Sequence, residues 1–95
     1  MTNDGRTRVT AKGLVHGRVQ GVWFRGFTRE QALQHGVSGY ARNQADGTVA
    51  VALSGPREAV ENVLDALHIG PPLARVERVE INWGDAEDYD GFSTG

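Results

Sequence analysis

A short loop with two glycines, followed by an arginine, is the part of the sequence whose residue types and spacing most clearly predict chemistry. The loop runs from Gly17 to Gly21, and Arg25 follows it at the start of an expected helix. Backbone N–H groups of a glycine-bearing loop that leads into a helix form a cradle for phosphate oxygens, and the helix dipole adds partial positive charge. The guanidinium of Arg25 supplies a planar fork for two of those oxygens, which lysine could not copy. This segment therefore predicts the binding of phosphate or of a similar anion such as sulfate.

Asn43 is the second candidate, and two interpretations of it remain open. A neutral amide cannot act as a general base at neutral pH, but it can donate and accept hydrogen bonds and so hold a water for attack on phosphorus. Asparagine is also common in turns, and Asn43 stands just before Asp46-Gly47, so it could simply be a turn residue. Arg25, taken alone, would likewise be an ordinary solvated helix residue. Together these residues predict a phosphate site with a polar partner, which is not yet a hydrolase.

Alternating and helical patterns of apolar residues predict the elements that must position these residues. A strand is expected over Arg8 to His16, with Gly13 as a bulge or a point of close approach. The later elements are expected in this order: a helix from Val22 to about His35, strands over 37–42 and 48–53 joined by a hairpin at Asp46-Gly47, a helix that begins with Pro56 and ends at Gly70, a strand around Val79 to Trp83, and a short last strand at Phe92. Trp23 and Trp83 are expected to be packing residues, although Trp23 could also border the loop site.

The order of elements, βαββαβ, predicts a ferredoxin-like α+β sandwich of two layers, in which two helices cover one face of an antiparallel sheet. In that topology the first and second strands run in the same direction, and the third, antiparallel strand lies between them. Their carboxyl-terminal ends therefore meet at one edge of the sheet, separated by two strand spacings, or roughly 10 Å. One strand ends at the glycine loop and the other at Asn43, and Arg25 can lean over the same edge. We expect all three to reach one small ligand.

Length and composition restrict the classes of protein. The 95 residues allow one domain, 1–95, in which residues 1–6 are expected to be a flexible tail. The net charge of −2 argues against binding to nucleic acid, which should show a basic excess. No apolar run suits a signal peptide or a membrane span, and there are no cysteines, so we expect a cytoplasmic protein that does not associate with a membrane. The three histidines are too scattered to suggest a metal site.

Two motifs in the sequence resemble those of the acylphosphatase family. The first signature of that family, Gly-x-Val-Gln-Gly-Val-x-Phe-Arg, matches residues 17–25. The second, Gly-aromatic-x-x-Asn followed by Asp-Gly-x-Val and a later glycine, matches 39–43, 46–49 and Gly55, and the Gly-Pro-Pro run in 70–76 is also similar. The resemblance leaves out only the first half-dozen residues and the acidic tail. Ala41 and Ala50 depart from the residues common in the family, but neither belongs to the expected chemistry.

The resemblance implies a small acylphosphatase, an enzyme that splits acyl phosphates into carboxylate and inorganic phosphate without a metal or any other cofactor. In this interpretation Arg25 binds the phosphate and Asn43 orients the attacking water. Backbone N–H groups of the loop complete the phosphate cradle, and they belong to Arg18, Val19, Gln20, Gly21 and Val22. No protein base is evident, so the substrate's own phosphate oxygens are expected to accept the proton. We expect a monomer that acts on small-molecule acyl phosphates.

Three other functions remain as alternatives. A non-catalytic ferredoxin-like module would bind an anion or a partner without turnover, which an activity assay distinguishes. An RNA-binding domain would show paired exposed aromatic residues on the central strands and a basic face, whereas these strands carry Val, Ala, Gly, Thr and Lys. A domain related to the acylphosphatase-like part of a larger carbamoyl-phosphate-processing protein fits a chain of 95 residues less well.

Overall fold

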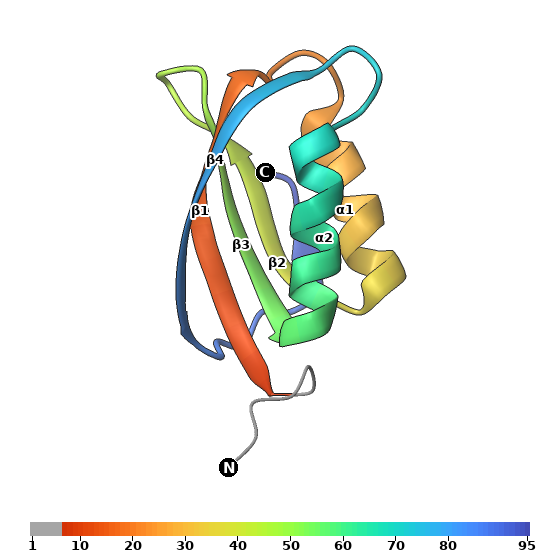
Figure 1. Ribbon diagram of the computed structural model, residues 1–95, viewed down its shortest axis with the longest axis vertical. Coiled ribbons are helices and arrows are strands. Elements are labelled where there is room, and N and C mark those ends of the chain that lie inside the picture. The colour runs from red at the N-terminus through yellow and green to blue at the C-terminus, as the bar shows by residue number, and fades with distance from the viewer. Residues whose placement is uncertain (1–6) are drawn as a thin grey trace.

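The computed structural model describes residues 7–95, so the expected N-terminal tail (1–6) lies outside the described residues. In this part of the chain five strands and two helices follow one another: β1 (Arg8–Arg18), α1 (Phe24–His35), β2 (Ser38–Asn43), β3 (Val49–Pro56), α2 (Arg57–Ile69), β4 (Arg75–Asp85) and β5 (Phe92–Ser93). The two helices lie side by side on one face of a single sheet (Figure 1). The predicted ferredoxin-like α+β sandwich of two layers is confirmed.

The order of strands in the sheet is β4-β1-β3-β2-β5. Strand β3 pairs antiparallel with both β1 and β2, so those two strands run in the same direction, as predicted. Strand β4 pairs antiparallel with the outer edge of β1. The short last strand adds a parallel edge, because β5 pairs with β2 through Gly39 opposite Phe92. The expectation of an antiparallel sheet therefore holds for β1 to β4 and not for β5.

The core lies between the sheet and the helices. Strand β3 contributes Val49, Val51 and Leu53, which alternate along the strand and are almost fully buried. The buried residues of α2 recur at helical spacing and are Val60, Val63, Leu64 and Leu67. The period of two along β3 and the helical spacing along α2 show that burial of apolar surface fixes which side of each element faces inward.

The junction between β1 and α1 differs from the prediction. Strand β1 continues through Gly17 to Arg18, because a bulge after His16 lets it keep pairing with β4. Helix α1 begins at Phe24 rather than Val22, since Trp23 has the left-handed backbone angles φ 66° and ψ 23° and cannot belong to a helix. The loop between β1 and α1 therefore covers residues 19–23, whereas the sequence predicts residues 17–21.

The structure also refines the prediction for Gly13 and the predicted starts of α2 and β4. Gly13 is a point of close approach rather than a bulge, because a Cβ there would lie 1.6 Å from the carbonyl oxygen of Glu80 on β4. Helix α2 starts one residue after Pro56, whose ψ of 138° is extended. Strand β4 starts at Arg75 and so pairs with the bulged end of β1.

The segment that joins β4 to β5, residues 86–91, crosses the sheet face opposite the helices. It links the two edge strands of the sheet, and on the way Glu87 contacts β1 and β3 while Tyr89 packs edge-on against Tyr40 of β2 at 5.9 Å between ring centres. We call it the crossing segment. The sequence suggests a solvated acidic stretch, and the carboxylates are indeed exposed, but the backbone of the segment is bound to the sheet.

A closed ring of three hydrogen bonds holds the crossing segment. The backbone N–H of Glu87 donates to Oγ1 of Thr10 at 2.8 Å, and the Thr10 hydroxyl donates to Oγ of Ser54 at 3.1 Å. The Ser54 hydroxyl in turn donates to the carbonyl oxygen of Glu87 at 2.6 Å. Thr10 and Ser54 are almost fully buried, so each of these polar groups depends on the ring for its partner.

We expect Thr10→Val to destabilise the protein by about 1–3 kcal/mol, because the replacement keeps the shape but leaves the Glu87 N–H without its acceptor and removes the bond donated to the Ser54 hydroxyl. Urea denaturation would measure the free energy of unfolding. The control is Glu87→Gln, which removes the exposed ion pair with Lys12 and keeps the backbone ring, and should change stability less. If the control were as harmful as Thr10→Val, the ring would not be what fixes the segment.

Candidate active site

A pocket of about 280 Å³ opens at the end of the sheet where β1 and β2 finish, the upper end in Figure 1. It draws on the loop, helix α1, strand β2 and the C-terminal tail, and its lining residues are Val19, Gly21, Trp23, Phe24, Arg25, Gly26, Asn43 and Thr94. The structure thus brings Arg25 and Asn43 together with part of the glycine loop. The other candidate loop residues, Arg18, Gln20 and Val22, are not among the residues that line the pocket.

Two buried valines hold the loop in place. Val19 and Val22 are 1% and 7% exposed and belong to the core, whereas Gly21 between them is exposed. Gly21 has φ 73°, and a Cβ there would meet nothing within 4 Å, so glycine is needed for the turn and not for space. Gly17 differs, since a Cβ there would lie 2.1 Å from the carbonyl oxygen of Arg75. The loop backbone is therefore at the surface and anchored on both sides.

The start of helix α1 suits an anion. Its first turn contains no acidic residue, and no side chain caps it. The first N–H groups of a helix have no partner within the helix and carry partial positive charge. Because Phe24, Arg25 and Gly26 of this first turn line the pocket, that charge lies beside it. In α2, by contrast, Glu58 occupies the first turn.

Arg25 is held by the end of the chain. Its Nη1 donates to the carbonyl oxygen of Thr94 at 2.8 Å, and Thr94 itself lines the pocket. The tail is anchored one turn away, where Arg29 donates to the carbonyl oxygen of Phe92 at 3.3 Å and the Phe92 ring is buried. A guanidinium has five N–H donors, so the contact with Thr94 orients Arg25 and leaves a fork for two acceptor oxygens.

Asn43 is the last residue of β2 and lies opposite Val49 in β3. The turn that follows is closed by other residues: Gln44 N–H donates to the carbonyl oxygen of Thr48 at 2.9 Å, and Asp46 accepts hydrogen bonds from the Thr48 hydroxyl and N–H at 2.6 and 3.0 Å. These two bonds, the hydroxyl first, lower the pKa of the Asp46 carboxyl. Among the described residues, the side-chain hydrogen bonds that close this turn therefore come from Asp46 and Thr48 and not from Asn43. This favours the interpretation of Asn43 as a site residue over that of a turn residue.

The side chain of Gln20 joins the loop to this hairpin. Its Nε2 donates to the carbonyl oxygens of Gln44 at 2.8 Å and Thr48 at 2.9 Å. One amide thus bridges both arms of the hairpin directly beyond Asn43. The sequence indicates only the backbone N–H of Gln20 and does not indicate Thr94 at all, since these contacts join residues 24, 28 and 69 positions apart.

Two negative findings concern residues 7–95. No group of three or more His, Asp or Glu side chains in this range is arranged to hold a metal ion, and His16 contacts Glu80 on the far face of the sheet instead. Neither of the two described helices is long and apolar enough to cross a membrane.

Comparison with known proteins identifies the family. A family model described as Acylphosphatase matches residues 11–94. An acylphosphatase of Salinibacter ruber is 48% identical over 93 residues, which are 97% of this chain and 96% of the relative. An acylphosphatase of Thermus thermophilus is 53% identical over 79 residues, covering 83% of this chain and 90% of the relative. The solved structure of an acylphosphatase from Coxiella burnetii superposes with a TM-score of 0.89 at 30% identity, with all of both chains covered. The chain therefore belongs to the acylphosphatase family.

Proposed function

We propose that this protein hydrolyses the carboxyl–phosphate bond of acyl phosphates by direct attack of water, without a metal. Family membership supports the activity. The observation that carries the mechanism is that Arg25 and Asn43, from two different elements, line one pocket with the loop and the uncapped start of α1. The phosphate binds to the Arg25 fork and to backbone N–H groups of the loop. Asn43 orients the water.

For this reaction the protein mainly has to position the water and the phosphoryl group and to stabilise negative charge. The water oxygen bonds to phosphorus as the bond from phosphorus to the acyl oxygen breaks, and the carboxylate leaves with the electron pair. One proton of the water moves to an oxygen of the phosphoryl group, so the products are a carboxylate and inorganic phosphate. A carboxylic acid has a pKa of about 4, so the leaving group departs unprotonated at neutral pH. Accordingly, none of the described residues that line the pocket is Asp, Glu or His.

The catalytic advantage comes from donors fixed before the substrate arrives. Thr94 orients Arg25, and Gln20 ties the loop to the hairpin that carries Asn43. Donors held in place at a site of developing negative charge stabilise the transition state without reorganising at the moment of reaction. The amide of Asn43 both accepts and donates, so it can hold a water in line with phosphorus without removing its proton.

The RNA-binding alternative finds no support in the sheet. The two central strands, β1 and β3, contain no Phe, Tyr or Trp that could stack a base. The face that would bind RNA is crossed by residues 86–91, and Tyr40 on β2 is already packed against Tyr89 and Arg42. A non-catalytic anion-binding module would share the pocket, so turnover of an acyl phosphate separates it from an enzyme.

We expect wild-type protein to hydrolyse benzoyl phosphate in the presence of EDTA, and Arg25→Ala to lower kcat/KM by about 10²–10³-fold, the usual loss when one fixed transition-state donor is removed. Arg25→Lys should also lose kcat/KM strongly, because a lysine cannot bind two phosphate oxygens in the geometry of the guanidinium fork. Inhibition by inorganic phosphate should weaken in both variants. Arg78→Ala, which removes an exposed arginine from β4, is the matched control. Normal turnover by Arg25→Ala would refute the role of this residue.

For Asn43→Ala we expect kcat to fall by about 10²-fold or more while inhibition by inorganic phosphate stays near the wild-type value, since the residue positions water and does not hold the anion. Steady-state kinetics with benzoyl phosphate, run beside phosphate inhibition, would separate the two effects. A variant with wild-type kcat, or one that loses phosphate affinity instead, would contradict a water-orienting Asn43.

Gln20→Met keeps the length of the side chain and removes both hydrogen bonds to the hairpin. We expect kcat to drop about 10-fold, because small displacements of a positioning group are costly in rate. In an Asn43→Ala background the same substitution should have little further effect, since its action passes through Asn43. Losses that simply multiply in the double variant would mean that Gln20 acts independently of the hairpin.

A further inference from the structure

Trp23 adopts a backbone conformation that bulky residues avoid. With φ 66°, it is the one non-glycine residue with positive φ within residues 7–95. Such a conformation is a genuine outlier for a large side chain, and strained residues of this kind cluster at functional sites. Nothing in the turn itself requires tryptophan, because glycine or asparagine adopts these angles more readily.

Gly26, three residues later, is matched to Trp23. Glycine is unfavourable inside a helix, yet it occupies the first turn of α1. A Cβ at position 26 would lie 2.3 Å from Nε1 and 2.5 Å from Cε2 of the Trp23 indole, so the indole rests directly against the Gly26 backbone. Trp23 and Gly26 are each unfavourable at their own position, and together they place the indole ring of Trp23.

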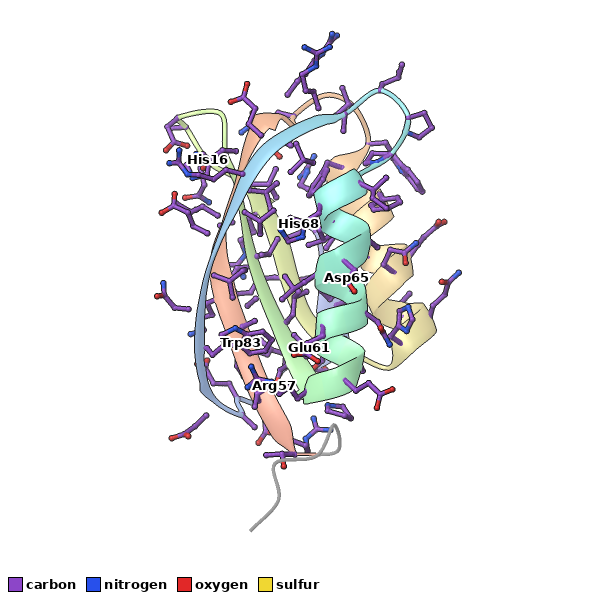
Figure 2. The ribbon with its side chains drawn as sticks, viewed as in Figure 1. His16, Arg57, Glu61, Asp65, His68 and Trp83 are labelled. Atoms are coloured by element: carbon purple, nitrogen blue, oxygen red, sulfur yellow. The ribbon has the colours of Figure 1, made fainter. Side chains whose placement is uncertain are left out.

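The placed ring does not serve the core. Trp23 is 59% exposed and is absent from the hydrophobic core, although Phe24 beside it is buried. Trp83, the other tryptophan, has a different environment, since its ring is covered by the guanidinium of Arg57 at 4.3 Å near the start of α2, at the lower end of the sheet (Figure 2). The exposed surface of Trp23 instead lines the pocket that contains Arg25 and Asn43.

The pocket therefore has a polar part and an aromatic part. Arg25, Asn43 and the loop backbone suit the phosphate, which has only five heavy atoms and leaves room in a pocket of about 280 Å³. The acyl group is attached to that phosphate and must lie against whatever remains of the lining. The large apolar surface that is both exposed and part of this lining is the Trp23 indole.

We propose that Trp23 is a specificity-determining residue whose indole binds the acyl group, so that the enzyme favours acyl phosphates with flat aromatic or unsaturated acyl groups over those with small ones. This inference rests on the proposed acyl phosphate hydrolysis. It adds the chemical class of the acyl group, which the phosphate-binding residues do not select.

The test compares benzoyl phosphate with acetyl phosphate, because the two substrates share the reacting bond and differ in the acyl group. Trp23→Asn removes the ring and suits the left-handed backbone. We expect kcat/KM for benzoyl phosphate to fall about 10-fold, the size of one aromatic contact, and kcat/KM for acetyl phosphate to change less than about 2-fold. Trp23→Phe should recover most of the preference. Inhibition by inorganic phosphate should not change.

A second variant moves the ring without removing it. Gly26→Ala favours the helix but places a methyl group where the indole rests, so it should also reduce the preference for benzoyl phosphate. In the Trp23→Asn background the same change should leave the ratio of the two substrates unaltered. Thermal unfolding would confirm that each variant is folded.

Equal losses on both substrates in Trp23→Asn would overturn this inference, because Trp23 would then act by shaping the loop. Wild-type kcat/KM for both substrates in Trp23→Asn would overturn it as well. In both cases an active wild type leaves the proposed function standing. If the wild type hydrolyses neither substrate, the proposed function fails and the inference fails with it.

Discussion

The pairing of β3 with both β1 and β2 is the constraint on which the candidate site depends. Val49 of β3 has Val15 of β1 as its partner on one side and Asn43 of β2 on the other. Asn43 is therefore level with Val15, three residues before β1 ends at Arg18, and two strand spacings or roughly 10 Å away from it. A register shift of two residues would preserve the buried faces and move Asn43 by about 7 Å along the strand. Correct register, and not burial alone, brings the amide to the loop.

Long-range hydrogen bonds then fix the groups that the sheet brings together. Gln20 binds the two carbonyl oxygens that flank the hairpin turn, and Thr94 binds Arg25. Thr94 reaches Arg25 because the crossing segment carries the chain from one edge of the sheet to the other and β5 pairs beside β2. The ring formed by Thr10, Ser54 and Glu87 on the far face of the sheet thus also supports the tail that orients Arg25. The hydrogen bonds that stabilise the crossing segment therefore also help to position Arg25.

The sequence alone predicts the features that follow from local periodicity. It indicates both helices, the hairpin at Asp46-Gly47, the position of β3 between β1 and β2, and the meeting of Arg25 and Asn43 at one sheet edge. It does not indicate the left-handed Trp23, since propensity favours a helix there. Nor does it reveal the partners of Gln20 and Thr94, because each depends on one hydrogen-bond geometry between distant residues. The exact course of the crossing segment is missed for the same reason: its exposed acidic side chains obscure a backbone bound to the sheet.

Several residues around the pocket are poor choices for stability, and their common location has a physical explanation. Helix α1 lacks a capping side chain and an acidic first turn, either of which would stabilise it. A cap would, however, occupy the N–H groups that an anion needs, and a carboxylate would repel that anion. Trp23 and Gly26 likewise oppose local preference in order to hold a ring at the surface. The strong apolar stripe of α2 and the buried face of β3 provide stability elsewhere. The fold can therefore tolerate a helix start that remains open to its ligand.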